Sequence, residues 1–171
     1  EDDMKYLSLF TGIGGFELGI GNRGECVGFS EIDSSAIKVY SRHFNHKNYG
    51  DVSTINTSEL PDFDLLVGGS PCQDLSVAGK QGGLSGDRSG LFFHFVRILK
   101  EKQPRYFIWE NVKGTLSSQN GWDFARVQIE MAEAGYSIQW QILNSADFGV
   151  PQSRERIFLI GHTRENSGPK V

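Results

Sequence analysis

The stretch YLSLFTGIGG, residues 6–15, decides the fold of this chain. Its apolar first half, residues 6–10, is typical of a buried strand. The glycines that follow at once allow a tight turn and a close approach of the backbone to a ligand. Residues 14–20 then predict a helix. A strand, a glycine-rich turn and a helix in this order indicate the first unit of a parallel α/β sheet.

Strands and helices continue to alternate along the rest of the chain. Further strands are expected at 27–30, 48–50, 63–67, 106–109, 136–143 and 156–160. The last two strands have no long helix between them, so they predict an antiparallel pair at the edge of a mostly parallel sheet. Helices are expected from the predicted cap Ser34 to about His43, from the predicted cap Ser89 to Pro104, and over 122–135, where Trp122, Ala125, Ile129 and Ala132 mark the helix.

Composition limits the class of protein. The 171 residues carry a formal net charge of −4 and are 38% hydrophobic, which predicts one globular domain. The two cysteines lie far apart, which excludes a disulfide scaffold and a CxxC zinc site, and no metal is expected. No apolar run approaches the ~20 residues that cross a bilayer, and no signal peptide opens the chain, so we expect a cytoplasmic protein without a membrane partner. The acidic balance argues against a protein that coats nucleic acid.

The ends of the predicted strands carry the candidate site. Ligands of such sheets bind outside the carboxyl ends of the strands. Glu31, 19 residues beyond Gly12, could accept hydrogen bonds from ribose hydroxyls, and with the glycine turn it indicates an adenosine-type cofactor, for which NAD fits as well as S-adenosylmethionine. Asp51 could accept from an adenine amino group, although a lone aspartate here is more typical of a helix cap. One site should form from the residues after Phe10, Ser30, Gly50, Val67 and Trp109.

A cysteine follows the strand at 63–67. Cys72 stands just past a buried strand at a predicted helix start, where thiolates are stabilised, although a lone cysteine is more often buried and structural. The segment 74–88 after it contains four glycines together with Lys80 and Arg88. It is either an ordinary surface loop or a lid that closes on a polyanion.

Two further strand-end runs carry charged groups. Glu110-Asn111-Val112 follows the strand at 106–109, so its carboxylate would face the same site as the cysteine. The segment at the entry to the final strand is, by itself, more typical of a charged edge that faces solvent. Its alternating residues would lie on one side of the sheet: Gln152, Arg154 and Arg156.

In their order along the chain, these motifs resemble the DNA (cytosine-5)-methyltransferases of the bacterial and phage modification type. Each motif alone is weak to moderate, whereas the whole set in this order is specific. The resemblance implies a Rossmann-like S-adenosylmethionine-dependent methyltransferase fold, with S-adenosylmethionine as cofactor and double-stranded DNA as substrate. It covers about residues 7–161 and rests on Phe10-x-Gly12-x-Gly14, Glu31, Asp51, Pro71-Cys72-Gln73, Glu110-Asn111-Val112 and Gln152-x-Arg154-x-Arg156.

The resemblance also implies roles for individual residues. Glu31 would hold the ribose, and Cys72 would be the nucleophile. Glu110 would contact the N3 edge of cytosine, while Arg156 would lie near its O2 with Arg154 beside it. The cofactor site would comprise Phe10, Gly12, Gly14, Gly15, Glu31, Ile32, Asp51, Val52, Gly69, Pro71 and Leu91, with Ile32, Asp51 and Val52 at adenine. DNA contacts would come from Gln73, Ser76, Lys80, Arg88 and Gln152.

The implied reaction explains why these residue types are needed. Cytosine C5 is a poor nucleophile, and attack of the Cys72 thiolate at C6 raises the electron density at C5. A carboxyl group at N3 and a cation at O2 stabilise the charge that enters the ring. Because the base cannot react inside the DNA stack, it must be flipped out, and the segment 74–88 would close over it.

The family ordinarily continues into a target-recognition domain and a final helix. We therefore expect residues 1–171 to form a catalytic domain that is incomplete at its C-terminus and lacks target recognition. It would be a fragment, a remnant, or one subunit of an enzyme whose second polypeptide supplies the rest. A nicotinamide-dependent oxidoreductase and a non-catalytic DNA-binding module are the alternatives. The first leaves Cys72 and Glu110 unexplained, and the second does not need them.

Overall fold

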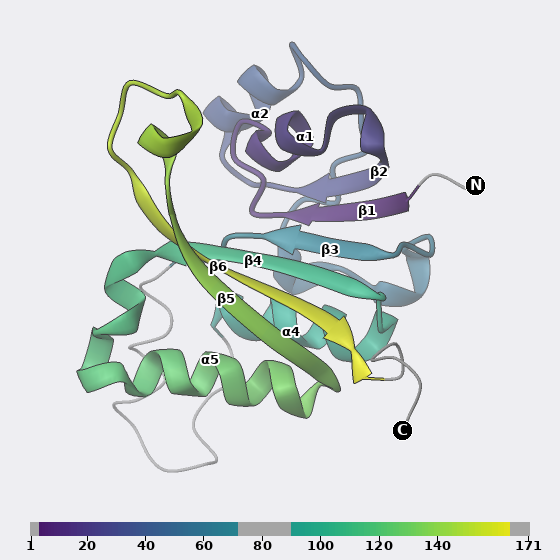
Figure 1. Cartoon of the computed structure of the whole chain (residues 1–171). Coiled ribbons are helices and arrows are strands. Elements are labelled where there is room, and N and C mark those ends of the chain that lie inside the picture. Colours follow the sequence, from purple (N-terminus) through teal and green to yellow (C-terminus); the bar gives the residue numbers. More distant parts are fainter. Residues whose placement is uncertain (1–3, 72–89, 165–171) are drawn as a thin grey trace.

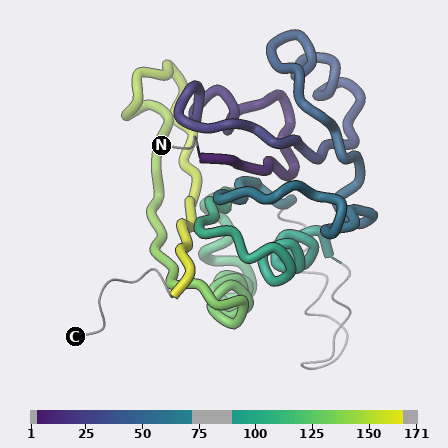
Figure 2. Tube along the Cα trace, turned by 90° about the vertical axis from the view of Figure 1, so that its right-hand side faces the viewer, coloured from purple at the N-terminus to yellow at the C-terminus, as the bar shows by residue number. Residues whose placement is uncertain are grey.

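The computed structural model describes residues 4–71 and 90–164 (Figure 1). Its strands are β1 (Met4–Leu9), β2 (Gly24–Ser30), β3 (Leu65–Gly68), β4 (Tyr106–Val112), β5 (Tyr136–Asn144) and β6 (Glu155–Thr163). Within the described residues they form a six-stranded sheet in the order β2-β1-β3-β4-β6-β5. The pairs among β1 to β4 are parallel, whereas β6 is antiparallel to both β4 and β5. The predicted α/β fold with an antiparallel edge pair is therefore confirmed, and Figure 2 shows β5 and β6 along one side of the molecule.

Helices connect these strands. The α-helices are α1 (Gly15–Ile20), α2 (Ser34–Tyr40), α4 (Leu91–Lys102) and α5 (Trp122–Glu133). Short 3-10 helices are η1 (Gly21–Arg23), η2 (Val52–Thr54), η3 (Thr57–Glu59), η4 (Lys113–Leu116), η5 (Ser118–Gly121) and η6 (Ser145–Phe148). In the described part of the chain, no helix is long and apolar enough to span a membrane. Nor do these residues contain a cluster of three His, Cys, Asp or Glu side chains that could hold a metal ion.

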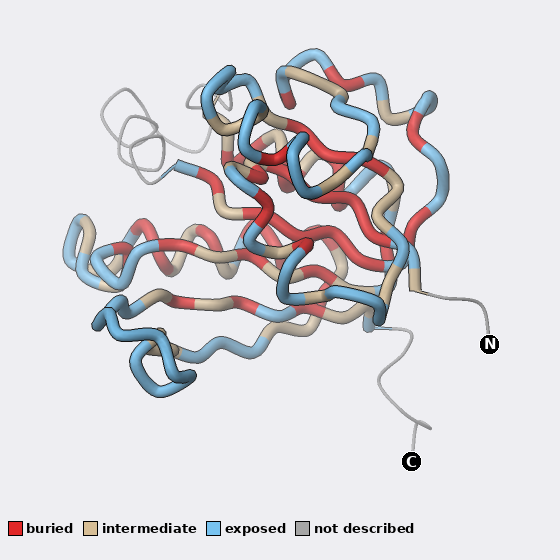
Figure 3. Tube along the Cα trace, turned by 90° about the horizontal axis from the view of Figure 1, so that it is seen from above, coloured by how far each residue is buried: buried red, intermediate tan, exposed pale blue. Residues whose placement is uncertain are grey.

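Side chains of the parallel strands are buried on both faces of the sheet, because successive residues of a strand point to opposite sides. Leu7 and Leu66 belong to the main core, which also contains the buried sides of α4 and α5. Tyr6 and Leu65 belong to a smaller cluster on the other face, against which Phe16 of α1 packs. Figure 3 shows these central strands as the most buried part of the chain. Burial on two faces holds the carboxyl ends of the strands in place, and there the loops of the candidate site begin.

The strand predicted at 48–50 does not form. Only an isolated parallel bridge joins Phe29 and Asn48. The Asn48 side chain accepts hydrogen bonds from the backbone N–H groups of Glu31 and Gly50, at 3.3 and 2.9 Å. Gly50 has a φ of 72°, in the left-handed region, so the chain turns away after the bridge. Turn chemistry therefore prevails over strand pairing in this segment.

Two predicted helix starts need correction. The cap of α2 is Asp33 rather than Ser34, because the Asp33 carboxylate accepts from the Ser35 N–H at 2.8 Å. This helix ends at Tyr40 instead of continuing to His43. The cap of α4 is Gly90, and the predicted cap Ser89 lies outside the described residues.

The strand predicted at 106–109 is longer than expected. β4 continues to Val112 because β6 pairs with it as far as the Val112–Arg156 pair. Glu110 and Asn111 therefore lie within a strand rather than in the loop after it. This difference places Glu110 on a defined face of the sheet, since its neighbours in the strand point the other way.

The helix predicted over 122–135 forms, but its two large apolar markers lie on its outer side, while Ala125 and Ala132 are half-buried. Trp122 and Ile129 are 75% and 56% exposed. The side that packs on the sheet carries Phe124, Val127 and Met131, at the helical spacing of three and four residues. The helix has more apolar side chains than its buried side can hold. Which of them are buried is decided by how the helix packs and not by its sequence alone.

Candidate active site

Two adjoining cavities open where the strands β1 to β4 end. The first, which we call the Glu31 cavity, has a volume of about 280 Å³. The second, the Glu110 cavity, has a volume of about 370 Å³. Phe10 and Gly69 line both, so the two cavities share a wall. The expected convergence of the strand ends is confirmed, because residues following β1, β2 and β3 meet Glu110 of β4 here.

The glycine-rich turn after β1 forms part of this wall. Gly12 and Gly14 have φ angles of 58° and 97°, which L side chains rarely adopt. A Cβ on Gly14 would also lie 2.6 Å from the Phe44 ring. These two glycines shape the turn, whereas Phe10 and Gly15 line the Glu110 cavity directly. The predicted cofactor residues of the turn therefore lie close together. Two of them give the turn its shape, and two line the cavity.

Glu31 stands at the end of β2 and is held by backbone groups. One carboxylate oxygen accepts from the Gly12 N–H at 2.8 Å. The other accepts from the N–H groups of Ile32 and Asp33, at 2.8 and 2.9 Å. The carboxylate therefore joins the glycine turn to the end of β2 and is oriented in the wall of its cavity. An acceptor in this position suits a ligand that carries hydroxyl groups.

The far end of the Glu31 cavity combines an acceptor with apolar surface. Asp51 accepts from the Ser53 N–H at 2.8 Å and caps η2, as its lone position suggested. This hydrogen bond lowers the pKa of the Asp51 carboxyl below its ordinary value. Apolar walls come from the predicted residues Ile32, Val52, Pro71 and Leu91, which with Asp51 line the same cavity. A flat nitrogen heterocycle attached to a ribose fits this set of acceptors and apolar groups, so the residues present suit an adenosine-containing cofactor.

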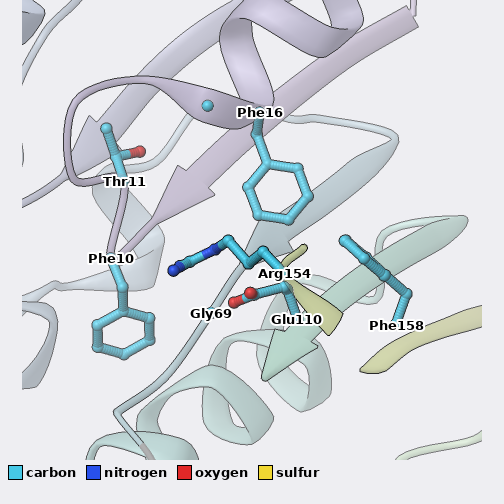
Figure 4. A pocket seen from close by; sticks show the side chains of 8 residues that line it. Phe10, Thr11, Phe16, Gly69, Glu110, Arg154 and Phe158 are labelled. Carbon is cyan, nitrogen blue, oxygen red and sulfur yellow. The ribbon is translucent and has the colours of Figure 1, made fainter. Parts of the chain in front are cut away.

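The Glu110 cavity brings together groups from distant parts of the chain. Figure 4 shows the side chains of Glu110 and Arg154 between the rings of Phe10 and Phe16. Glu110 forms an ion pair with Arg156, whose Nε lies 3.1 Å from the carboxylate. The predicted catalytic residues Glu110, Arg154 and Arg156 are therefore brought together.

The electrostatic environment of Glu110 has two opposing parts. Burial raises the pKa of its carboxyl above the ordinary value, while the charges of Arg156 and Arg154 oppose this rise. Gly69 allows the backbone to approach the Glu110 carboxylate closely, because a Cβ at this position would lie only 2.6 Å from a Glu110 oxygen. This close approach contributes to the burial of the carboxylate. The result is a carboxyl group that accepts a proton more readily than an exposed glutamate does. Such a group suits proton donation to a ligand.

A buried hydrogen-bond cluster holds the segment that leads to Cys72. The Trp109 indole N–H donates to the Ser70 hydroxyl at 3.1 Å. The Asn111 side chain donates to the Ser70 carbonyl at 2.9 Å. The sequence did not predict a role for Ser70. A buried tryptophan N–H needs an acceptor, so a hydroxyl group near Trp109 could have been expected.

Other lining residues were also missed. Thr11 and Phe16 flank the glycines of the turn, and Phe158 continues the alternation of Arg154 and Arg156 by two positions. Gln152 is exposed in the turn before β6, where its carbonyl accepts from the Ser145 hydroxyl, and it does not line either cavity. The predicted site residues Cys72, Gln73, Ser76, Lys80 and Arg88 lie outside the described residues.

Comparisons with known proteins identify the family. The family model of C-5 cytosine-specific DNA methylases matches residues 4–169. An orphan methyltransferase of Bacillus phage rho11s is 51% identical over 92% of this chain and 33% of its own length. The type II methyltransferase M.HhaI of Haemophilus parahaemolyticus is 42% identical over 92% of this chain and 48% of its own length.

Solved structures agree with this match. A DNA modification methyltransferase encoded within an E. coli prophage has a TM-score of 0.77 at 27% identity, covering 98% of this chain and 49% of that one. A Spodoptera frugiperda DNMT2 variant has a TM-score of 0.76 at 25% identity, covering 98% and 52%. The chain spans about a third to a half of the length of the curated relatives it matches. Its motifs, its fold and these matches together show that the chain belongs to the C-5 cytosine-specific DNA methylase family.

Proposed function

We propose that this chain is the cofactor-binding and catalytic portion of a DNA (cytosine-5)-methyltransferase. The reaction transfers the methyl group of S-adenosylmethionine to C5 of a cytosine in double-stranded DNA. The observation that carries the proposal is the shared wall of the two cavities at Phe10 and Gly69. It allows a nucleoside-type cofactor and a reacting base to lie next to each other. Family membership favours S-adenosylmethionine over a nicotinamide cofactor.

The Glu31 cavity holds the adenosine part of the cofactor in this proposal. Glu31 accepts from the ribose hydroxyls, and Asp51 accepts from the adenine amino group. The apolar side chains of Ile32, Val52 and Leu91 lie against the faces of the ring. When bound, the cofactor supplies an electrophilic methyl group on a sulfonium ion.

The Glu110 cavity holds the cytosine. A carboxyl group with a raised pKa donates a proton to N3, which prepares the ring for nucleophilic attack. Arg156 lies beside Glu110 and stabilises negative charge at O2, with Arg154 in the cavity wall. Because these groups lie in and beside a cavity at the ends of the strands, the cytosine leaves the DNA stack to reach them.

Cys72 follows Pro71, a lining residue of the Glu31 cavity, and is the nucleophile in this proposal. Its thiolate forms a bond to C6, and the electrons of the C5–C6 double bond move toward C5 and the N3 that Glu110 protonates. C5 then takes the methyl group, and the electron pair of the broken carbon–sulfur bond stays on the sulfur of S-adenosylhomocysteine. The C5 proton passes to water as the Cys72–C6 bond breaks, which re-forms the C5–C6 double bond and frees the thiolate. N3 returns its proton to Glu110.

Recognition of a particular DNA sequence requires further protein surface. We propose that it is contributed by sequence outside residues 4–169, on the same polypeptide or on a second one, because the relatives are two to three times longer than their match to this chain. The charged residues Lys80 and Arg88 are proposed contacts to the DNA backbone.

The proposal is tested with DNA that contains 5-fluorocytosine. Fluorine at C5 cannot leave as a proton does, so the enzyme stays covalently attached after methyl transfer. With S-adenosylmethionine present, the protein that contains this chain should form an adduct visible as a shift on a denaturing gel, and Cys72→Ser should abolish it. Cys26→Ser is the matched control, since Cys26 lies on β2 outside both cavities, and this variant should keep the adduct. An adduct in Cys72→Ser would contradict the assignment of the nucleophile.

A further inference from the structure

Glu17 is a buried carboxylate that the proposed mechanism does not use. It lies in the first turn of α1 and is only 2% exposed. One of its oxygens accepts hydrogen bonds from the hydroxyl groups of Thr11 and Tyr40, at 3.2 and 3.3 Å. The other oxygen is buried and has no hydrogen-bond partner among the described residues. A glutamate is almost never buried to this degree unless it is paired, so its retention here calls for a reason.

The hydrogen bonds around Glu17 run in one direction. Because the Thr11 hydroxyl donates to Glu17, it accepts from the hydroxyl of Ser8, to which it is also bonded. The Tyr40 hydroxyl likewise donates to Glu17 and accepts from His46 Nδ1, 2.8 Å away. Both chains of donors therefore end on one carboxylate oxygen of Glu17.

No ion pair among the described residues includes Glu17. Glu17 is linked to the Glu110 cavity through Thr11, which lines that cavity and binds Glu17 through its hydroxyl. A buried negative charge acts over longer distances than an exposed one, because less water screens it. A cofactor whose adenosine lies in the Glu31 cavity, and whose positive charge lies at the wall shared with the Glu110 cavity, would therefore be stabilised by Glu17, whereas a neutral cofactor of the same shape would not.

We propose that Glu17 is a positioning residue of the cofactor turn, and that its charge favours the cationic cofactor S-adenosylmethionine over S-adenosylhomocysteine, the product that has lost the sulfonium charge. The inference rests on the proposed function. Through Thr11, Glu17 holds the turn that separates β1 from α1. Its charge then raises the affinity of the substrate form of the cofactor relative to the product form.

The experiment measures the affinity of the protein that contains this chain for both molecules by titration calorimetry. Glu17→Gln keeps the shape and one acceptor oxygen but removes the charge. We expect it to weaken S-adenosylmethionine binding about tenfold, with at most about a twofold change for S-adenosylhomocysteine, because only the first carries the sulfonium charge. Glu25→Gln is the matched control, because Glu25 is exposed on β2, and the ratio of the two affinities should stay at the wild-type value.

A second pair of variants separates positioning from charge. Thr11→Val removes the hydroxyl link and leaves the Glu17 charge in place, so both affinities should fall by the same factor. Thr11→Ser restores the hydroxyl and should restore both affinities. The melting temperature of each variant shows whether it has folded. If Glu17→Gln does not fold, Glu17→Met removes the same charge with an apolar side chain of similar length, and the same change in ratio is expected.

The outcomes distinguish this inference from the proposed function. If the wild-type protein that contains this chain binds neither molecule, the proposed function fails and the inference falls with it. If the wild-type protein binds both, and the folded variant without the Glu17 charge keeps the wild-type ratio, the inference alone is overturned. A ratio that falls equally in Glu25→Gln overturns it as well, because net charge would then be the cause.

Discussion

The two cavities are built in different ways. The Glu31 cavity depends on short-range contacts, in which backbone N–H groups of the turn and of the residues after β2 hold one carboxylate. The Glu110 cavity depends on side chains from β4 and β6, which are distant in sequence and meet only because these strands pair. A shift of β6 by one residue would move Arg156 to the other face of the sheet and leave Glu31 untouched. One cavity is thus a product of turn chemistry, and the other of strand register.

This difference also separates the chemistry of the two carboxyl groups. Three backbone N–H groups present Glu31 as an acceptor. Glu110 has a guanidinium partner and a buried environment that raises its pKa, so it binds a proton more readily than an exposed glutamate does. The first carboxylate suits binding, and the second suits chemistry. Variants of each should therefore affect different steps.

The largest effect is expected for Glu110→Gln. The amide keeps the shape of the side chain but cannot transfer a proton, so the rate of methyl transfer should fall about 10²–10³-fold. Cofactor affinity should stay at the wild-type value, because Glu110 lines the cavity proposed for the cytosine and not the Glu31 cavity proposed for the adenosine. Single-turnover transfer of a labelled methyl group and calorimetry measure the two quantities.

Glu155→Gln is the control for this variant, since Glu155 is an exposed partner of Lys113. It should leave both the rate and the affinity unchanged. A loss of cofactor affinity in Glu110→Gln as large as its loss of rate would show that the two cavities do not work separately.

Glu31→Gln should produce a smaller effect, and it should change cofactor affinity rather than the rate of methyl transfer. A hydrogen bond to a charged group contributes about 1.5–3 kcal/mol, so cofactor affinity should fall about 10- to 100-fold. The rate at saturating cofactor should change little. Calorimetry and single-turnover rates at high cofactor concentration test this, with the exposed Glu133→Gln as control. A rate that stays low at saturating cofactor would mean that Glu31 also acts in the chemical step.

The smallest effect concerns the pH dependence of stability. Because burial raises the pKa of Glu110 in the folded state above its ordinary value of 4.5, the folded state binds this proton more tightly than the unfolded state does. Its contribution to the free energy of unfolding is then lost as the pH rises from about 4.5 through the folded pKa. The stability of the wild type minus that of Glu110→Gln should fall over this window and level off on both sides.

Denaturant unfolding at a series of pH values measures this difference. Arg156→Gln gives a further check, since Arg156 lowers the pKa of Glu110 in the folded state, and its removal should extend the upper end of the window to higher pH. A difference that increases with pH would mean that the ion pair with Arg156 outweighs burial.

Much of the fold and of the Glu31 cavity could be predicted from the sequence. The run 6–15 predicted a strand, a turn and a helix, and the position of Glu31 after the second strand was correct. The prediction was wrong where neighbours in space decide the outcome. β4 extends past Trp109 because β6 pairs with it, and α5 buries Phe124 rather than Trp122 because of the shape of the sheet. The segment 48–50 turns instead of pairing because the Asn48 side chain binds its own neighbours.

By itself, the sequence determined the order of strands and helices and the residue types at the strand ends. Turns, caps and apolar periodicity arise from contacts between residues near one another, and a few adjacent residues encode them. Only the tertiary structure decided that Glu110 pairs with Arg156, that Ser70 accepts from Trp109, and that Glu17 is buried. These contacts join segments far apart in the chain, and their formation depends on the register and packing of the whole sheet.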